Sequence, residues 1–389
     1  MQAIWPFLKL IFRNLARQKL RNGLTGFGLV VAICAFGLLR TVVDAWYAGA
    51  EATSANRLIT RNAISLVFPL PISYLQRIRQ VEGVTNVSYA NWFGGVYIDP
   101  KNFFPQFAVD PESYLAMYPE FQLSDAERSG FLHDRQGAVA GRKVAEQFGW
   151  KVGDTIPLRG TIYPGTYSFV LRGIYRGVDR KTDETQFLFH WKSLNERLKT
   201  SQASRAEQVG IYVVEIGKPG RAAEISLAID RLFQNSLAET LTETEKAFQL
   251  SFVAMTEAIL TAIELVSFVI IFIIMAVMAN TIAMSVRERK REYATLRALG
   301  FGPPYIVGLI LGESVSIALL GGLTGLAITF PLAAKFADRF GSLFPVFSVS
   351  DQTIALSGAA SLLVGCAAAA LPVWRTLRTP VHEGLTSLG

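Results

Sequence analysis

The residues whose types and spacing could do chemistry are the charged ones between positions 285 and 301. This segment reads SVRERKREYATLRALGF, and its arginines and glutamates recur about one helical turn apart. Apolar residues recur at steps of seven, three and three, which predicts a short amphipathic helix; they are Val286, Tyr293, Leu296 and Leu299. Gly300 and the glycine and prolines after it predict the helix end. Composition alone fits two hypotheses equally: a helix that moves rigidly with flanking membrane helices, and an anchor on a lipid surface.

The rest of the sequence gives no sign of catalysis or of metal binding. It has no G-x-S-x-G and no H-E-x-x-H motif, and its three histidines are far apart. The two cysteines, Cys34 and Cys366, lie in apolar runs, so we expect neither a disulfide framework nor a cysteine-rich metal site. We therefore expect that this chain is not an enzyme and holds no metal.

The composition indicates a membrane protein. The 389 residues are 51% hydrophobic and 18% charged, whereas soluble domains average about a quarter charged, and the mean hydropathy is +0.31. Four apolar stretches are long enough to cross a bilayer, at 23–43, 265–284, 305–330 and 353–373. Glu313 lies inside the third stretch, where an acid is costly; we expect it to have a structural, hydrogen-bonded role near the interface.

The positive charge predicts how the chain is oriented. Residues 1–22 hold five bases and no acid, 285–304 hold five bases and two acids, and the tail from 374 holds two bases and one acid. All three segments lie on the cytoplasmic side only if there are four spans with both termini inside. The net charge of +7 then reflects topology, and we expect no nucleic-acid partner.

The segment between the first two spans predicts an external α+β domain. Helix signals occur at 71–81 and 221–234, a strand followed by a helix at 138–148, and strand patterns at 84–98, 155–158, 167–175 and 208–216. A stretch with few breakers at 238–264 predicts a helical stalk that leads into the second span.

These signals give a complete predicted organisation. The fold class is an α-helical membrane protein with four transmembrane helices and an α+β extracytoplasmic domain inserted between the first and second. The segments are an amphipathic cytoplasmic helix (1–22), the first span (23–43), the external domain with its stalk (44–251), the stalk end and second span (252–284), a cytoplasmic helix (285–304), the third span (305–334), a short external loop (335–352), the fourth span (353–373) and a cytoplasmic tail (374–389).

Glycines in the last two spans suggest close helix packing in lipid. The predicted packing residues are Gly321, Gly325, Gly358 and Gly365. The sequence leaves open whether they pack within one subunit or between two.

Segment 285–301 resembles the R-x-R-x-E-x-x-x-x-R-A-x-G signature of FtsX/MacB-type (type VII) ABC transporter permeases. The similarity continues along the chain, with Asn14 to Arg17 near the start, Glu313-Ser314 followed by Gly321-Gly322 and Gly325, GWKVGDTIPL from Gly149, and a closing pattern from Pro372 to Pro380 and Val381. The large external domain resembles the MacB-like and lipoprotein-releasing (LolC/LolE-like) branches more than the cell-division one.

The resemblance implies that the helix after the second span docks on an ABC ATPase. The implied docking residues are Arg287, Glu288, Arg289, Arg291, Glu292, Leu296, Arg297 and Gly300. The sequence has no G-x-x-x-x-G-K-[ST], so we expect no directly bound cofactor, with ATP and Mg bound by a separate P-loop ATPase subunit. Because ABC ATPases work as dimers, the resemblance also implies a second permease subunit, with a homodimer expected.

The function implied by the resemblance is mechanotransmission in the bacterial inner membrane. ATP hydrolysis by the partner would change the conformation of the periplasmic domain and export an amphiphile, peptide or lipoprotein, with a periplasmic adaptor and an outer-membrane channel as possible further partners. The alternative is a transmission protein that transports nothing and activates an external hydrolase or sensor.

Overall fold

The computed structural model describes residues 4–51, 53–179, 182–340 and 347–378. The chain divides into two compact units. A helical unit comprises residues 1–44, 257–338 and 347–389, and a sheet domain comprises 45–256 with 339–346. Each unit is described by itself.

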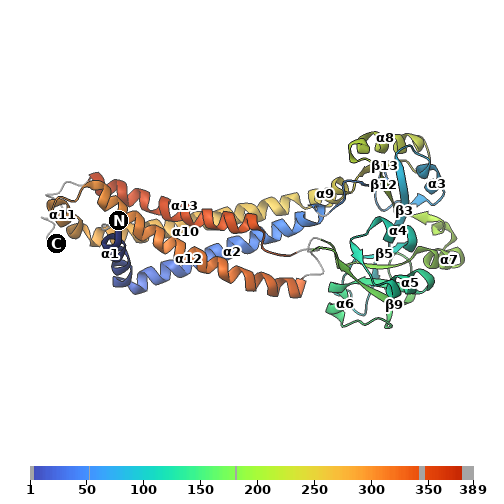
Figure 1. Cartoon of the computed structure of the whole chain (residues 1–389), viewed down its shortest axis with the longest axis horizontal. Coiled ribbons are helices and arrows are strands. Elements are labelled where there is room, and N and C mark those ends of the chain that lie inside the picture. Colours follow the sequence, from blue (N-terminus) through green and yellow to red (C-terminus); the bar gives the residue numbers. More distant parts are fainter. Residues whose placement is uncertain (1–3, 52, 180–181, 341–346, 379–389) are drawn as a thin grey trace. The chain divides into compact units, whose positions relative to one another are not determined.

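Four long apolar helices make up most of the helical unit, which confirms the prediction of four such helices. They run side by side in Figure 1, and the short helices α1 and α11 lie at the same end of this unit. The bounds are α1 Ile4–Arg17, α2 Lys19–Glu51, α10 Glu257–Glu288, α11 Lys290–Ala298, α12 Pro303–Phe340 and α13 Asp351–Arg378. The stretches long and apolar enough to cross a membrane are Lys19–Ala48, Glu257–Glu288, Pro303–Ala337 and Asp351–Arg378.

These helices extend beyond several of the predicted segments. Helix α2 continues past residue 43 to Glu51. Across the predicted end of the span, Arg40 pairs with Asp44 one helical turn later, with 3.1 Å between Nε and Oδ1. Helix α12 reaches Phe340 and so takes up the start of the segment predicted as a loop at 335–352. Helix α13 continues to Arg378, while Pro380 and Val381 of the predicted tail lie outside the described residues.

Glycines allow the long helices to approach closely. A Cβ atom added at Gly325 would lie 2.7 Å from the carbonyl oxygen of Val30, and one at Gly321 would lie 3.0 Å from that of Gly26, both on α2. A Cβ at Gly365 would lie 2.8 Å from the Cβ of Ala318 on α12. A Cβ at Gly358 meets no described atom within 4 Å. Three of the four predicted glycines therefore lie at contacts within one chain.

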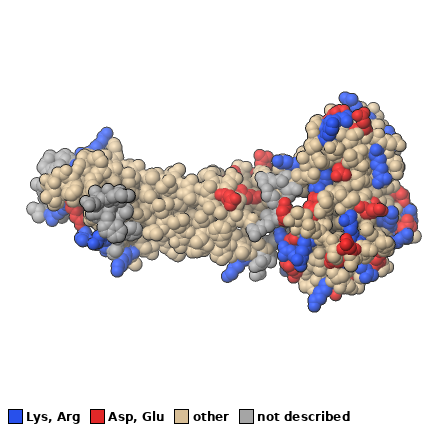
Figure 2. Space-filling model, viewed as in Figure 1, with Lys and Arg blue, Asp and Glu red and all other residues tan. Residues whose placement is uncertain are grey.

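Charge is unevenly distributed over the helical unit. On the face shown in Figure 2, charged side chains gather at the end that holds α1 and α11, and most of the length of the helices is uncharged. This distribution is what a lipid environment around the four apolar helices requires, because an exposed charge at mid-membrane depth is costly.

The sheet domain is built on one large mixed sheet. Its strands run in the order β13-β1-β12-β3-β5-β10-β7-β9-β8-β4, with β6 paired to β9, and β11 pairs with β2 separately. The strands are β1 Arg57–Asn62, β2 Leu70–Pro71, β3 Val84–Trp92, β4 Gly95–Val96, β5 Gln106–Val109, β6 Phe121–Gln122, β7 Gly137–Gly141, β8 Thr155–Gly160, β9 Gly165–Gly177, β10 Phe187–His190, β11 Gln208–Val209, β12 Ile211–Ile216 and β13 Thr240–Thr244.

Helices cover both faces of this sheet. They are α3 Tyr74–Arg79, α4 Pro111–Met117, α5 Asp125–His133, α6 Arg142–Phe148, α7 Trp191–Ser201, α8 Ala222–Leu232 and α9 Glu245–Met255. Alternate residues along each strand enter two separate cores. Leu58 of β1 belongs to the core that also contains residues of α3, α6, α7 and α8, whereas the adjacent Ile59 belongs to the core with residues of α4, α5 and α9. The sheet is therefore the middle of three layers.

Most local predictions for this domain are confirmed. The structure has α3 within 71–81, β7 and α6 within 137–148 with Gly149 left-handed at φ 68°, β8, β9 and β12 as predicted strands, and α8 within 221–234. The helical stalk predicted at 238–264 is wrong at its start. Residues Thr240–Thr244 form β13, which pairs antiparallel with β1, and a break at Thr256 separates α9 from α10.

Candidate coupling site at the junction of α10 and α11

The site is formed where the second long helix gives way to a short one. Helix α10 ends at Glu288, Arg289 has φ −103° and ψ 13°, and α11 begins at Lys290. Backbone hydrogen bonds continue across the break, from the Arg289 amide to the Ser285 carbonyl (3.3 Å) and from the Tyr293 amide to the Arg289 carbonyl (3.1 Å). The two helices are therefore joined by a bend that keeps its hydrogen bonds.

The far end of α11 has a glycine stop. Gly300 has φ 92°, a conformation that side chains disfavour, and the amide of Phe301 donates to the Leu296 carbonyl at 3.0 Å. The structure thus confirms the predicted end of the helix at Gly300.

Arg289 is the centre of the site. Its side chain is buried, with its Nη1 2.9 Å from Glu313 Oε2 and its Nε 2.9 Å from Glu292 Oε2. Ser285 Oγ completes the cluster by donating to Glu313 Oε1 at 3.4 Å. One guanidinium thus connects the bend to α11 on one side and to α12 on the other.

The surroundings keep this charge in place. Burial lowers the pKa of Arg289, but Tyr293, Glu292 and Glu313 together raise it above its ordinary value. Burial also raises the pKa of the Glu292 carboxyl, yet hydrogen bonds from Arg289 and Arg17 bring its net pKa below the ordinary value. Both groups therefore remain charged at neutral pH.

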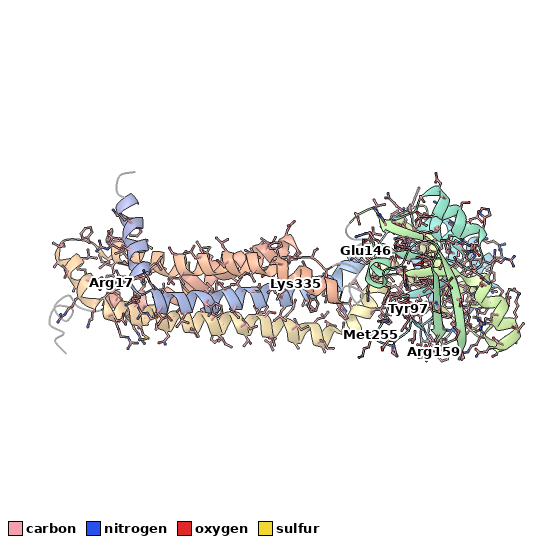
Figure 3. All side chains as sticks on the ribbon, turned by 90° about the horizontal axis from the view of Figure 1, so that it is seen from below. Arg17, Tyr97, Glu146, Arg159, Met255 and Lys335 are labelled. Carbon is pink, nitrogen blue, oxygen red and sulfur yellow. The ribbon has the colours of Figure 1, made fainter. Side chains whose placement is uncertain are left out.

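The N-terminal helix is tied to the same junction. Arg17 at the end of α1 forms an ion pair with Glu292, and Arg21 of α2 lies 2.8 Å from Glu288 (Nη1 to Oε1), which also accepts from Gln18. Figure 3 shows Arg17 at the end of the helical unit where these helices meet. Helices α1 and α2 are thus connected to α10 and α11 by charged side chains.

Helix α1 also packs on α12. A Cβ added at Gly308 would lie 3.1 Å from the ring of Phe7, and one at Gly312 would lie 2.5 Å from Ile11 Cδ1. The two α1 residues are one turn apart, as are the two glycines they face. The two glycines on α12 therefore leave the space into which the side chains of α1 pack.

The predicted docking residues do not all share one environment. Arg287, Glu288, Arg291 and Gly300 are exposed, Glu292, Leu296 and Arg297 are partly buried, and Arg289 is buried. Arg297 Nη2 donates to the carbonyl oxygen of Thr376 on α13 at 3.3 Å. The apolar stripe is buried at Tyr293 and packs inward at Val286 and Leu296.

Two features of the site escaped the sequence analysis. Leu299 and Phe301 are 71% and 42% exposed and form an apolar tip directly after the end of α11. The partner of Glu313 is Arg289, which was expected to face outward. A signal was present, because Ser285, Arg289 and Glu292 follow the four- and three-residue steps of one helix face, and that face points at α12.

No group of three or more His, Cys, Asp or Glu residues that could hold a metal ion occurs in the part of the chain that the structure describes. What the arrangement offers is a fixed set of charges that connects the five helices α1, α2, α10, α11 and α12, and a charged, partly apolar surface.

The fold and the site define a membrane protein with four apolar helices and a large sheet domain. Residues 264–381 match the FtsX-like permease C-terminal family. An uncharacterised ABC transporter permease of Methanocaldococcus jannaschii is 24% identical over 378 residues, which is 91% of each chain. The chain thus contains an FtsX-like permease domain and is a homologue of ABC transporter permeases, MacB among them.

Other relatives match over part of their length. The macrolide export ATP-binding/permease protein MacB of Shewanella oneidensis is 29% identical over 189 residues, which cover 49% of this chain and 26% of MacB. Among solved structures, the extracellular domain of the noncanonic ABC-type transporter YknZ from Gram-positive bacteria matches with a TM-score of 0.36 and 13% identity, over 49% of this chain and 99% of that one.

Proposed function

We propose that this chain is the permease subunit of an ABC transporter that couples ATP hydrolysis by a separate ATPase subunit to movement of its sheet domain. In this proposal the protein lies in the bacterial inner membrane with α1, α11 and the chain termini in the cytoplasm. The sheet domain lies outside, in the periplasm. The transporter exports an amphiphile, a peptide or a lipoprotein.

The observation that carries this proposal is the position of Arg289. Its guanidinium joins α10, α11 and α12, and its partner Glu292 also pairs with Arg17 of α1. A force applied to α11 therefore acts on several helices at once. Packed side chains and ion pairs with two discrete arrangements are the physical means by which such coupling travels.

The docking surface in this proposal comprises the exposed end of α10, the exposed side of α11 and the residues that follow it. It combines the charged side chains of Arg287 and Arg291 with the apolar tip of Leu299 and Phe301. Apolar anchors surrounded by charged groups are typical of stable protein interfaces. Arg289 contributes by positioning α11 from inside the bundle.

The proposal includes further partners, because ABC ATPases act as dimers. ATP and Mg are bound by the ATPase, which acts as a dimer, so a second permease subunit, identical in the simplest case, completes the assembly. A periplasmic adaptor and an outer-membrane channel would extend the export route.

Co-purification tests the proposal directly. The chain is co-expressed with each ABC ATPase encoded near its gene and purified. The complex is then reconstituted into nanodiscs, and its ATPase activity is measured. We expect one ATPase to co-purify and to be regulated by the permease. Absence of any association with a P-loop ATPase would overturn the proposal.

The alternative, a transmission protein that activates an external hydrolase or sensor, shares this ATPase and differs in its output. It predicts an external protein that co-purifies with the sheet domain in a nucleotide-dependent way, and no accumulation of substrate in sealed inverted vesicles.

A further inference from the structure

The sheet domain contains a cavity of about 1390 Å³ on the face that α9 covers. Ile59, Phe107 and Tyr114 of the second core line it, which places it above the sheet strands β1, β5 and the helix α4. Ligand cavities in proteins usually measure about 300–1,000 Å³, so this one has room for a large molecule.

One face of α9 forms a wall of this cavity. Glu245, Phe248, Gln249 and Phe252 all line it, and their spacing of three, four and seven residues is that of a single helical face. The Phe248 and Phe252 rings contact each other edge to face, with centroids 5.1 Å apart. Phe252 is nevertheless 44% exposed, which is unusual for a large apolar side chain in an aromatic cluster.

Further aromatic residues occur among the polar and aliphatic residues of the remaining lining. Trp92, Tyr118, Phe121 and Tyr163 line the cavity from separate segments of the chain. Trp92 is 39% exposed, although its ring lies 5.3 Å from that of Phe107. Aromatic faces attract organic cations through the negative charge of their π-systems, and they also contact apolar groups.

A buried charge cluster lies in the same cavity wall. Arg57 Nε is 2.7 Å from Glu245 Oε2, and Arg57 Nη2 is 2.6 Å from Glu120 Oε1. Tyr118 donates its hydroxyl to Glu245 Oε1 at 3.0 Å. Two carboxylates thus share one guanidinium, which leaves one excess negative charge at this point.

A hydrogen-bond acceptor in the lining also lacks a partner. Gln186 Nε2 donates to Asp183 Oδ2 at 3.0 Å, while its buried Oε1 accepts no hydrogen bond from any residue that the structure describes. A buried acceptor without a donor is costly, and a ligand that carries an N–H group would remove that cost.

We infer that this cavity binds an amphiphilic organic cation, whose apolar body lies against the aromatic wall and whose positive charge faces Glu120 and Glu245. The inference rests on the proposed function, because it names the class of molecule that the permease recognises outside the membrane. It does not depend on the ATPase for its test.

Two ions of the same shape and opposite charge provide the test. Tetraphenylphosphonium and tetraphenylborate are each equilibrated with the full chain in nanodiscs, and binding is measured by dialysis against empty nanodiscs of the same lipid. We expect the phosphonium ion to bind at least about tenfold more tightly, because two carboxylates share one guanidinium here and the excess negative charge favours a cation by this much or more.

Variants with matched controls assign the binding to this cavity. Glu120→Gln and Phe252→Ala should each weaken phosphonium binding about threefold to tenfold. Glu82→Gln and Leu227→Ala, at exposed positions that do not line the cavity, should leave binding unchanged. Both cavity positions are partly exposed, and an unchanged melting temperature shows that the variants fold.

The outcomes separate this inference from the proposed function. Equal binding of the two ions, or undiminished binding in both cavity variants, overturns the inference and leaves ATPase coupling intact. Loss of ATPase association with preserved phosphonium binding overturns the proposed function and leaves the cavity assignment standing.

Discussion

Arg289 Nη1 lies 2.9 Å from Glu313 Oε2, and both side chains are less than a tenth exposed. The pair joins the bend between α10 and α11 to α12. A buried ion pair contributes little compared with apolar residues of the same size, but breaking it leaves a buried charge without its partner. The pair is therefore a sensitive point for both stability and coupling.

Removal of one member of this pair should destabilise the helical unit. We expect Glu313→Ala to cost about 3 kcal/mol, because the Arg289 guanidinium keeps only Glu292 and Ser285 no longer has its acceptor. The double variant Arg289→Met with Glu313→Met should recover most of that loss. Thermal unfolding in detergent measures both, and a double variant no more stable than Glu313→Ala would contradict the account.

Reversal of the exposed charges on the junction should leave the fold intact and remove coupling. Arg287→Glu with Arg291→Glu places two negative charges on the proposed docking surface, so we expect normal membrane insertion and loss of ATPase regulation. Lys101→Glu with Arg128→Glu, a matched reversal at exposed positions of the sheet domain, is the control. Unchanged regulation of the ATPase activity in the first variant would show that α11 is not part of the docking surface.

Glycine substitutions should separate contacts inside the chain from open positions. In Gly325→Ala the new methyl group meets the Val30 carbonyl oxygen at 2.7 Å, and we expect a loss of about 1–3 kcal/mol from overpacking. Gly358→Ala meets no described atom within 4 Å and should be neutral or stabilising by up to about 1 kcal/mol through helix propensity. Melting temperatures of the two variants in one detergent decide this, and equal effects would show that the contact is not tight.

The stability of the sheet domain should fall in mild acid because of His190. Its imidazole Nε2 lies 2.6 Å from the carbonyl oxygen of Phe131, and burial lowers its pKa below the ordinary value. Below about pH 6.5 the imidazole of the unfolded chain therefore binds a proton that the buried imidazole of the folded chain does not bind. The free energy of unfolding is at its full value above about pH 6.5 and decreases as the pH falls below it.

The measurement compares melting at pH 7.5 and at pH 5.5, above the range where carboxyl groups titrate. His190→Gln can still donate to Phe131 and should lose less stability over this interval than the unaltered protein. His133→Gln, at an exposed position, should retain the full pH dependence. Identical pH dependence in all three proteins would remove His190 as the cause.

The parts of the fold that follow from local signals could be predicted from the sequence. The helix α6 carries its own stop, Gly149, and the four apolar helices show in composition alone. Strand β13 could not be predicted, because its polar residues become a strand only through pairing with β1; Thr242 Oγ1 lies 2.9 Å from that of Thr60, 182 residues earlier.

The candidate site shows the same division. The helix at 290–298 and its end were visible as a periodic pattern, and so was the cost of an acid at Glu313. That Arg289 turns inward to meet this acid depends on how α10 and α12 pack, which no local pattern of Arg and Glu residues records. The cavity likewise joins Arg57, Glu120 and Glu245 from three distant segments.

The short link at Thr256 has a thermodynamic consequence. The α9 helix, one face of which lines the cavity, ends at Met255, and α10, which carries Ser285 and leads to Arg289, begins at Glu257. If a nucleotide state of the ATPase changes the affinity of the cavity by some factor, then occupancy of the cavity must change the affinity for that nucleotide by the same factor. A cation outside the membrane and a nucleotide inside the cell would thus each act as an effector of the other.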